Sequence, residues 1–281
     1  MEIVHTASGL DEMLQRCRLS GKTIGFVPTM GALHEGHATL VKRCAAENDL
    51  CVVSIFVNPT QFNNKEDLKR YPRTPEEDQR LLEHIGAAII FAPSEEEIYP
   101  EPDKRVFNFG MLDKVMEGQF RPGHFNGVAQ VVSKLFSFVH PDKAYFGEKD
   151  FQQLAIVREL VKQLGLPVQI VGVPIVREPD GLAMSSRNQR LSAEEKKNAA
   201  EIYRVLREST HMMRELYTPK QLTDFVIGEI NNVPGLNVEY FEIVDGNTLQ
   251  LISSWEKNIS SVGCIAVFCG AVRLIDNIRY N

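Results

Sequence analysis

The sequence predicts an α/β fold in which a parallel sheet, covered by helices on both faces, is followed by a smaller α+β domain. In the first two thirds of the chain, short β-rich runs alternate with segments of helical length and periodicity, which is typical of a parallel sheet. After Val176 the pattern changes to a loop rich in glycine, serine and arginine, and then to helices followed by strands. A length of 281 residues also favours two domains over one or three.

The expected elements follow one another along the chain. In the first part, strands are expected at 23–27, 50–57, 87–91, 143–146 and 168–176, and helices at 37–48, 75–84, 126–139 and 151–164. In the second part, helices are expected at 193–208 and 219–231, and strands at 238–244 and 264–268. We place the boundary after Val176, which gives domains of residues 1–176 and 177–281. Because ligands bind beyond the carboxyl ends of parallel strands, chemistry is expected in the loops there.

Composition and charge exclude several classes of function. The formal net charge of −6 and the pI near 5.7 provide no field that would collect a polyanion, so we expect no nucleic-acid partner. The five cysteines form an odd set without a C-x-x-C pair, and we interpret them as buried thiols in a reducing compartment. No apolar run approaches the ~20 residues that span a bilayer. We therefore expect no membrane segment and a cytoplasmic location.

The first chemical motif is a strand-to-helix turn that carries two histidines. It reads Pro28, Thr29, Met30, Gly31, Ala32, Leu33, His34, Glu35, Gly36 and His37. His34 and His37 can face one side of the first helical turn, where free backbone N–H groups already favour a phosphate. Alternatively, the two histidines are a polar pair that caps the helix. The spacing is not the H-E-x-x-H of zinc proteases, so a metal site would need further ligands.

Two further polar clusters follow later strands. The first contains Gly147, Glu148, Lys149 and Asp150. Lys149 can meet a phosphate and Asp150 can hold magnesium, although such a run is also typical of a solvated turn in which Asp150 caps a helix. The second cluster contains Met184, Ser185, Ser186 and Arg187, on a loop that begins with glycine. Its hydroxyls and guanidinium suit a triphosphate that is enclosed during reaction, and the alternative is a plain solvent-exposed loop.

Amide side chains follow the strand expected at 50–57, in the run Asn58-Pro59-Thr60-Gln61-Phe62. They lie beside the same sheet edge as the histidines and suit a hydroxylated substrate that carries a carboxylate. The alternative is a turn set by Pro59, because Asn-Pro is a strong turn signal by itself.

Taken together, these motifs resemble the pantothenate synthetase family. The family is matched in order, over most of the chain, by the runs GFVPTMGALHEGH at 25–37, FVNPTQF at 56–62, YPRTP at 71–75, RPGHFNGV at 121–128, YFGEKDFQQL at 145–154 and MSSRN at 184–188. The first run is also similar to the H-x-G-H signature of the wider nucleotidyltransferase superfamily, which is a looser signal than the combined set. The resemblance implies a Rossmann-like ATP domain, a smaller C-terminal lid domain, a homodimer and Mg²⁺.

The resemblance also implies the reaction and its residues. The carboxylate of pantoate attacks the α-phosphorus of ATP to give pantoyl adenylate and pyrophosphate, and the amine of β-alanine then displaces AMP to give pantothenate. ATP binding is implied for Pro28 through His37, with His37 as proton donor, and for Gly147 to Asp150, Met184 to Arg187 and the backbone of Val176. Gln61 and Gln153 should hold pantoate, with Asn58 beside them, and Gln61 should also lie near β-alanine. The sequence departs from the family at Gln189-Arg190, which affects outer contacts of the lid and no site residue.

The chemistry is expected to depend mainly on positioning and charge. A carboxylate that approaches a polyanionic phosphate is repelled, so His34, His37, Lys149, Arg187 and Mg²⁺ should offset the charge.

Three other functions compete with this one. A nucleotidyltransferase that releases an adenylated product would turn over without an amine. A sensor would bind ATP without turnover, but three clusters of phosphate-binding groups argue against it. A truncated tRNA ligase would need a basic face that the acidic balance does not provide.

Overall fold

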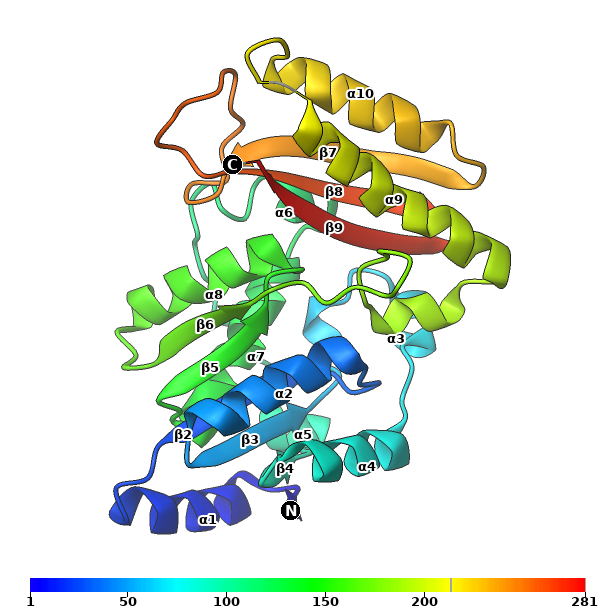
Figure 1. Ribbon diagram of the computed structural model, residues 1–281. Helices are drawn as coiled ribbons and strands as arrows, with labels where there is room; N and C mark the ends of the chain where they lie inside the picture. The colour runs from blue at the N-terminus through cyan, green and yellow to red at the C-terminus, as the bar shows by residue number, and fades with distance from the viewer. Residues whose placement is uncertain (213, 281) are drawn as a thin grey trace. The chain divides into compact units, whose positions relative to one another are not determined.

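The computed structural model describes residues 1–212 and 214–280, and the chain forms two compact units (Figure 1). The first unit comprises Met1–Phe109, Arg121–Glu148 and Gln153–Pro174, and the second comprises Gly110–Phe120, Lys149–Gln152 and Ile175–Asn281. Two short pieces from the earlier part of the chain thus belong to the second unit. The domain boundary after Val176 stays a prediction, and residues 213 and 281 of the second predicted domain lie outside the described residues.

The first unit is built on a six-stranded parallel sheet, which confirms the predicted fold class. The strand order is β1-β4-β3-β2-β5-β6, with β1 (Glu2–Val4), β2 (Ile24–Thr29), β3 (Leu50–Ile55), β4 (Ile89–Phe91), β5 (Lys143–Gly147) and β6 (Gln169–Val173). From β2 the chain continues to β3 on one side, whereas from the neighbouring β5 it continues to β6 on the other side. The strand order therefore reverses between β2 and β5. In open parallel sheets, ligands bind at such a switch point, beyond the carboxyl ends of the strands.

Helices pack on both faces of this sheet. The helices of the first unit are α1 (Ala7–Leu19), α2 (Glu35–Glu47), α3 (Lys65–Arg70), α4 (Pro75–Ile85), α5 (Glu95–Ile98), α7 (His124–Val139) and most of α8 (Phe151–Leu164), together with the 3-10 turn η1 (Pro59–Gln61). Of these, α2 and α7 pack directly on the sheet. Successive side chains of a strand point to opposite faces. Val27 accordingly lies in a core cluster with Val41 and Cys44 of α2, whereas the ring of Phe26 meets that of Phe136 in α7 at 6.2 Å between centroids. Side chains buried on both faces therefore stabilise the sheet, and the ends of its strands position the candidate site.

The second unit is a smaller α+β structure, also as predicted. Its antiparallel sheet has the order β7 (Leu236–Asp245), β8 (Ser261–Cys269) and β9 (Val272–Tyr280), and its helices are α6 (Met116–Phe120), α9 (Ala193–His211), α10 (Pro219–Asn231) and the 3-10 turn η2 (Ser186–Arg190). Leu206 of α9 and Val226 of α10 are fully buried in one core with Ile265 and Val267 of β8. Burial of side chains of this size contributes roughly 1.5–3 kcal/mol each.

An ion-pair cluster fastens α6 to the sheet of the second unit. Arg273 of β9 donates to both carboxylate oxygens of Glu117, at 2.6 and 2.9 Å, and Tyr240 donates to Glu117 at 2.9 Å. The backbone N–H of Glu117 in turn donates to Oε1 of Gln152 at 3.0 Å, and the Gln152 amide donates to backbone carbonyls of 112 and 115. These bonds explain why two short pieces of chain, 110–120 and 149–152, belong to this unit.

Eight elements were not predicted: β1, α1, α3, α5, α6, β9 and the 3-10 turns η1 and η2. β1 is an edge strand of only three residues, mostly exposed, and short edges carry no apolar pattern. Helix α1 is capped by Thr6, which accepts from the backbone N–H of Gly9 at 3.2 Å, and it buries Leu10 and Leu14 on one face. The apolar pattern of β9 is interrupted by four polar residues, and two of these, Arg273 and Asp276, form buried ion pairs within the unit.

Candidate active site

The turn after β2 is held in shape by a buried carboxylate. Ala32 and Leu33 donate their backbone N–H groups to Asp78 at 2.9 and 2.7 Å, and Thr74 donates its hydroxyl to the same carboxylate at 3.1 Å. Gly31 has a φ of 76°, and a Cβ there would lie 2.9 Å from Oδ2 of Asp78. Glycine is therefore required at this position for two reasons, the left-handed backbone and the close approach of Asp78.

The two histidines cap α2 through one nitrogen each. Nδ1 of His34 accepts from the backbone N–H of Gly36 at 3.1 Å, and Nδ1 of His37 accepts from the backbone N–H of His34 at 3.4 Å. A ring nitrogen that accepts carries no proton, so the proton of each neutral imidazole is on Nε2. The ring centroids are 4.1 Å apart. The capping interpretation is thus confirmed, and capping fixes both rings with a donor nitrogen on the side away from the cap.

The residues that follow β5 are divided between the two units. Glu148 ends its part of the first unit and donates its backbone N–H to the Val173 carbonyl at 2.8 Å. Lys149 and Asp150 belong to the second unit, where Asn277 of β9 donates its amide to the Lys149 carbonyl at 3.0 Å. The Lys149 ammonium lies 4.0 Å from the Asp150 carboxylate. These two charged side chains thus belong to a different unit from the histidines.

The third predicted cluster is ordered around η2 in the second unit. Ser185 caps this turn by accepting from the backbone N–H of Arg187 at 3.2 Å, and the Met184 N–H donates to the Val176 carbonyl at 3.0 Å. One lone pair of that carbonyl is therefore used within the protein. Asn188 ties the loop together by donating to Glu178 at 2.9 Å and to the Ala183 carbonyl at 3.1 Å.

A buried ion pair supports the start of this loop. The Arg177 guanidinium donates to both oxygens of Asp276, at 2.6 and 3.0 Å, and lies 3.6 Å above the ring of Tyr203. Burial raises the pKa of the Asp276 carboxyl, and the adjacent Arg177 opposes that shift. The residue after Val176 is thus anchored to β9.

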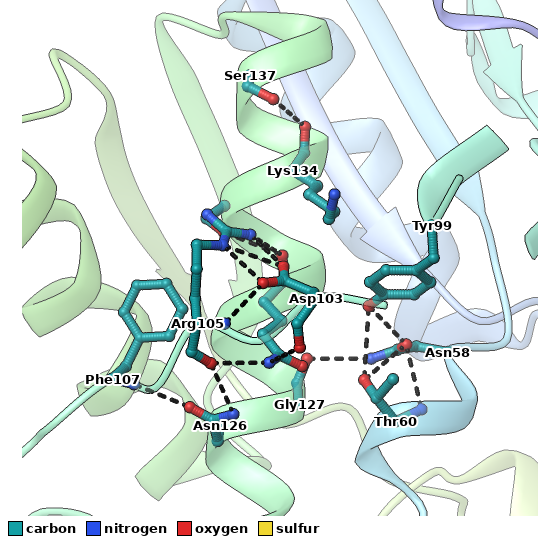
Figure 2. Close-up of polar contacts among 12 residues, drawn as sticks. Asn58, Thr60, Tyr99, Asp103, Arg105, Phe107, Asn126, Gly127, Lys134 and Ser137 are labelled. Carbon is teal, nitrogen blue, oxygen red and sulfur yellow. Dashed lines mark hydrogen bonds and ion pairs between the residues drawn. The ribbon is translucent and has the colours of Figure 1, made fainter. Parts of the chain in front are cut away.

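The amides after β3 are brought together within the first unit. Asn58 is only 1% exposed and donates its NH₂ group to Oε1 of Gln61 and to the Gly127 carbonyl, both at 3.1 Å. Figure 2 shows that Thr60 and Tyr99 converge on the carbonyl of the same Asn58 amide. Both donor hydrogens of Asn58 are used by the protein, so Asn58 is suited to positioning Gln61 rather than to contacting a substrate itself.

Gln153 and its neighbour Gln152 are suited to different roles. Gln152 is 4% exposed, and its amide forms hydrogen bonds with the backbone at 112, 115 and 117. Gln153, the next residue of α8, is half-buried and belongs to the first unit, as Gln61 does. Of the two neighbouring glutamines, Gln153 is therefore the one that can serve a ligand.

The described residues contain no ready-made metal cage. Within 1–212 and 214–280, no three His, Cys, Asp or Glu side chains are grouped as metal ligands. Mg²⁺ in nucleotide enzymes is held by one or two carboxylates and by substrate phosphates. Asp150, whose side chain is 46% exposed, fits the part of a single carboxylate ligand. No helix within these two ranges is both long and apolar enough to cross a membrane.

Comparison with known proteins identifies the family. A family model described as pantoate-beta-alanine ligase matches residues 2–279. The chain belongs to this family. Pantothenate synthetases from Bacteroides thetaiotaomicron and Phocaeicola vulgatus are 60% and 61% identical to it, over 100% of this chain and 99% of each relative. The resemblance predicted from the motifs is confirmed, and the protein is a ligase.

Solved structures agree with this assignment to the ligase family. A crystal structure of pantothenate synthetase from Thermus thermophilus is 44% identical, has a TM-score of 0.93 and covers 100% of this chain and 99% of its own. Pantoate-beta-alanine ligase from Francisella tularensis, solved in complex with beta-gamma ATP and beta-alanine, is 35% identical with a TM-score of 0.84. It covers 100% of this chain and 98% of its own.

Sequence reasoning missed several residues that shape the candidate site. Asp78 holds the histidine turn, Tyr99 and Gly127 hold η1, and Arg177 anchors the loop before η2. Only Asp78 left a signal, because it lies four residues before Leu82 on the apolar face of α4, where a charged residue needs a buried partner. The other three act through contacts between segments far apart in the sequence.

Proposed function

We propose that this ligase condenses pantoate with β-alanine at the expense of ATP, through pantoyl adenylate, and releases AMP and pyrophosphate. The proposal is supported by family membership over the whole chain and by the ligands of the Francisella tularensis relative. The observation that carries it is the start of α2, where two imidazoles turn a donor nitrogen away from the cap beside the switch point of the sheet. The positive end of the helix dipole there favours a phosphate.

In the first step, a carboxylate oxygen of pantoate attacks the α-phosphorus. The bond between the α-phosphorus and its bridging oxygen breaks, and pyrophosphate leaves with both electrons of that bond. His34 and His37 donate hydrogen bonds from Nε2 to phosphate oxygens, where charge grows in the transition state. If His37 supplies a proton to the leaving group, Nε2 is the atom that holds it, since Nδ1 accepts from the backbone.

The other ATP contacts are assigned from the family resemblance. Met30 to His37 line the phosphates, Lys149 and Arg187 bring cations to them, and Ser185 and Ser186 add hydroxyls. Gly147 and Glu148 border the same site, and Val176 meets adenine through its backbone. Asp150 would hold Mg²⁺, which offsets phosphate charge when it is bound.

In the second step, the amine of β-alanine attacks the acyl carbon of the adenylate. The carbon–oxygen bond to AMP breaks, an amide forms, and the amine loses a proton. Gln61 and Gln153 hold the pantoyl part in place for both steps. We propose that residues 177–281 act as a lid that excludes water from the adenylate, because a reactive acyl phosphate would otherwise hydrolyse. A cytoplasmic location fits the five free thiols. Four of them are buried as predicted, whereas Cys17 is only partly buried, so the prediction was wrong for that residue.

Exchange of labelled pyrophosphate into ATP tests the reaction. The enzyme with ATP, Mg²⁺ and pantoate, but no β-alanine, should catalyse the exchange, and omission of pantoate should abolish it. AMP release should then require an amine. Exchange that proceeds equally well without pantoate would refute the adenylate step. AMP release with no amine present would indicate hydrolysis of the adenylate. Net release of pyrophosphate with an adenylated product and no AMP would favour a nucleotidyltransferase instead.

We also propose that two copies associate through an open strand edge at 104–106. This extended segment is tied to α7 on one side, where Asn126 and Gln130 donate to the Arg105 carbonyl. Val106 is 86% exposed, and within the described residues the backbone groups of Lys104 and Val106 make no hydrogen bond. An unpaired edge invites a second strand.

Antiparallel pairing of two copies about Val106 places Arg105 opposite the partner copy's Phe107 ring and avoids facing like charges. Pairing about Arg105 would instead place two arginines face to face. Sedimentation equilibrium should therefore give a dimer, and Val106→Pro should give a monomer whose circular dichroism is native. A monomeric native protein, or a dimer that Val106→Pro leaves intact, would contradict this interface.

A further inference from the structure

The direction of the Asn58 amide is fixed by two backbone groups. The oxygen and nitrogen of an amide side chain can be exchanged by a flip, so their assignment depends on what their partners can do. The Gly127 carbonyl can only accept, so the Asn58 atom that faces it at 3.1 Å is the NH₂ group. The backbone N–H of Thr60 can only donate, so the atom that faces it at 3.4 Å is Oδ1. A flipped amide would place its oxygen against the Gly127 carbonyl and its NH₂ group against the Thr60 N–H.

Tyr99 reinforces this direction. Its hydroxyl donates to Oδ1 of Asn58 at 2.9 Å, and the Thr60 hydroxyl donates to the same oxygen at 3.0 Å (Figure 2). Burial raises the pKa of Tyr99, so the hydroxyl keeps its proton at neutral pH. The Lys134 ammonium lies 5.4 Å from the centroid of the Tyr99 ring and helps to hold it. With Asn58 buried, water does not compete for these bonds.

The Asn58 amide in turn fixes Gln61. Nδ2 of Asn58 is a donor, so the Gln61 atom that faces it at 3.1 Å is Oε1. Nε2 of Gln61 therefore points the other way, toward the sulfur of Met30 at 3.1 Å, which is a weak acceptor. The backbone of Gln61 is pinned as well, because its carbonyl lies 2.8 Å from Nδ1 of His124.

We infer that Gln61 binds pantoate as a hydrogen-bond donor, through its NH₂ group, and that Tyr99 and Asn58 are positioning residues that set this direction. The inference rests on the proposed function and adds that the NH₂ group of Gln61 makes the contact. It follows that Gln61 meets a carboxylate or hydroxyl oxygen of pantoate. An ammonium group offers only donors, so any contact of the Gln61 NH₂ with β-alanine is to its carboxylate.

Asn58→Asp tests the direction, since the two side chains have nearly the same shape. A carboxylate only accepts, so the Gln61 amide must turn its NH₂ toward residue 58 and present its carbonyl to pantoate. We expect kcat/KM for pantoate in pyrophosphate exchange to fall on the order of 10²-fold. Tyr99→Phe removes one of three donors to Oδ1 and should lower the same quantity about 3–10-fold. The Kd for ATP should change by about twofold or less in both, as neither substitution removes a group assigned to ATP.

Tyr145→Phe is the matched control for Tyr99→Phe. Its hydroxyl is also bonded to side chains, Glu47 and Asn48, at 2.9 and 2.8 Å, but these lie away from η1. It should lower the melting temperature and leave the pantoate kcat/KM unchanged. A native enzyme without pantoate-dependent exchange would refute the proposed function itself.

With native exchange present, unchanged pantoate kcat/KM in Asn58→Asp and Tyr99→Phe would refute the inference, as would equal losses for pantoate and ATP. If Asn58→Asp does not fold, Tyr99→Phe decides alone, because its ring and its contact with Lys134 are kept.

Discussion

Gly127→Ala probes how closely η1 must pack against α7 for pantoate to react. A Cβ on Gly127 would lie 2.5 Å from the Thr60 carbonyl oxygen and 2.8 Å from the Gln61 backbone nitrogen, whereas ordinary contact begins at 3.4 Å. The difference between 3.4 and 2.5 Å requires η1 to move by about 0.9 Å. The movement displaces Gln61 directly, because the close contacts are with its own backbone and that of the residue before it.

A displacement of about 1 Å at a substrate-positioning group can cost roughly 10²-fold in rate. We therefore expect pantoate-dependent pyrophosphate exchange of Gly127→Ala to fall about 10- to 10²-fold. Stability should change less, because overpacking costs about 1–3 kcal/mol and the gain in helix propensity returns about 1 kcal/mol.

Gly228→Ala is the matched control. Gly228 also lies inside a helix, α10, but a Cβ there meets nothing within 4 Å. This variant should melt slightly higher and exchange pyrophosphate at the native rate. If Gly127→Ala exchanges as fast as Gly228→Ala with the native KM for pantoate, close packing of η1 is not what positions Gln61, and the reasoning is wrong.

Three further results are expected. His37→Ala should lose on the order of 10²-fold in the rate of single-turnover adenylate formation. His37→Gln keeps a donor near the position of Nε2 and should lose less. Equal losses in the two variants would show that the hydrogen-bond donor is not what matters. Lys149→Ala should lose a similar factor in turnover while its circular dichroism stays native, and near-normal turnover would contradict its role. The Arg43 guanidinium, followed by the Tyr145 hydroxyl, lowers the pKa of Glu47 to about 2. In urea titrations, the native protein should therefore have a higher free energy of unfolding than Glu47→Gln, with the largest difference above about pH 4.3. The difference should vanish as the pH falls toward 2. A difference that stays constant over this range would contradict the expected pKa of Glu47.

Local patterns predicted the elements whose signals are complete within a short window. Helix α10 has a capping threonine, a proline in its first turn and four buried residues on one face, and both of its ends were predicted. Strand β9 could not be predicted in the same way. Its charged residues pair with partners far away in the sequence, such as Arg273 with Glu117, and these pairs make a polar strand suitable for burial.

The site was predictable as a set of motifs but not as a network. The histidine motif follows β2 and the amide motif follows β3, so the carboxyl-end rule was enough to predict that His34, His37 and Gln61 lie at one edge of the sheet. Tyr99 and Gly127 lie 38 and 66 residues after Gln61, and no local pattern connects them with it. Their importance comes from the packing of η1 against α7, which exists only in the folded chain.

The presence of a polar side chain does not determine which of its atoms donates and which accepts. In this protein, backbone groups determine it. A sequence can place a histidine or a glutamine at a strand end, but it does not say which nitrogen carries a proton or which amide atom faces a ligand. In this protein the N–H groups of His34 and Gly36 assign the protons of the two imidazoles to Nε2. The Thr60 N–H and the Gly127 carbonyl set Asn58 and, through it, Gln61. Under the proposed function, all three groups assigned to the ligands are therefore donors, which is the polarity required to hold an anionic acid against a triphosphate. The helix cap and the phosphate site, which competed as interpretations of the sequence, are compatible functions of the same imidazoles. The cap fixes one nitrogen of each ring, and under the proposed function the other nitrogen donates to the substrate.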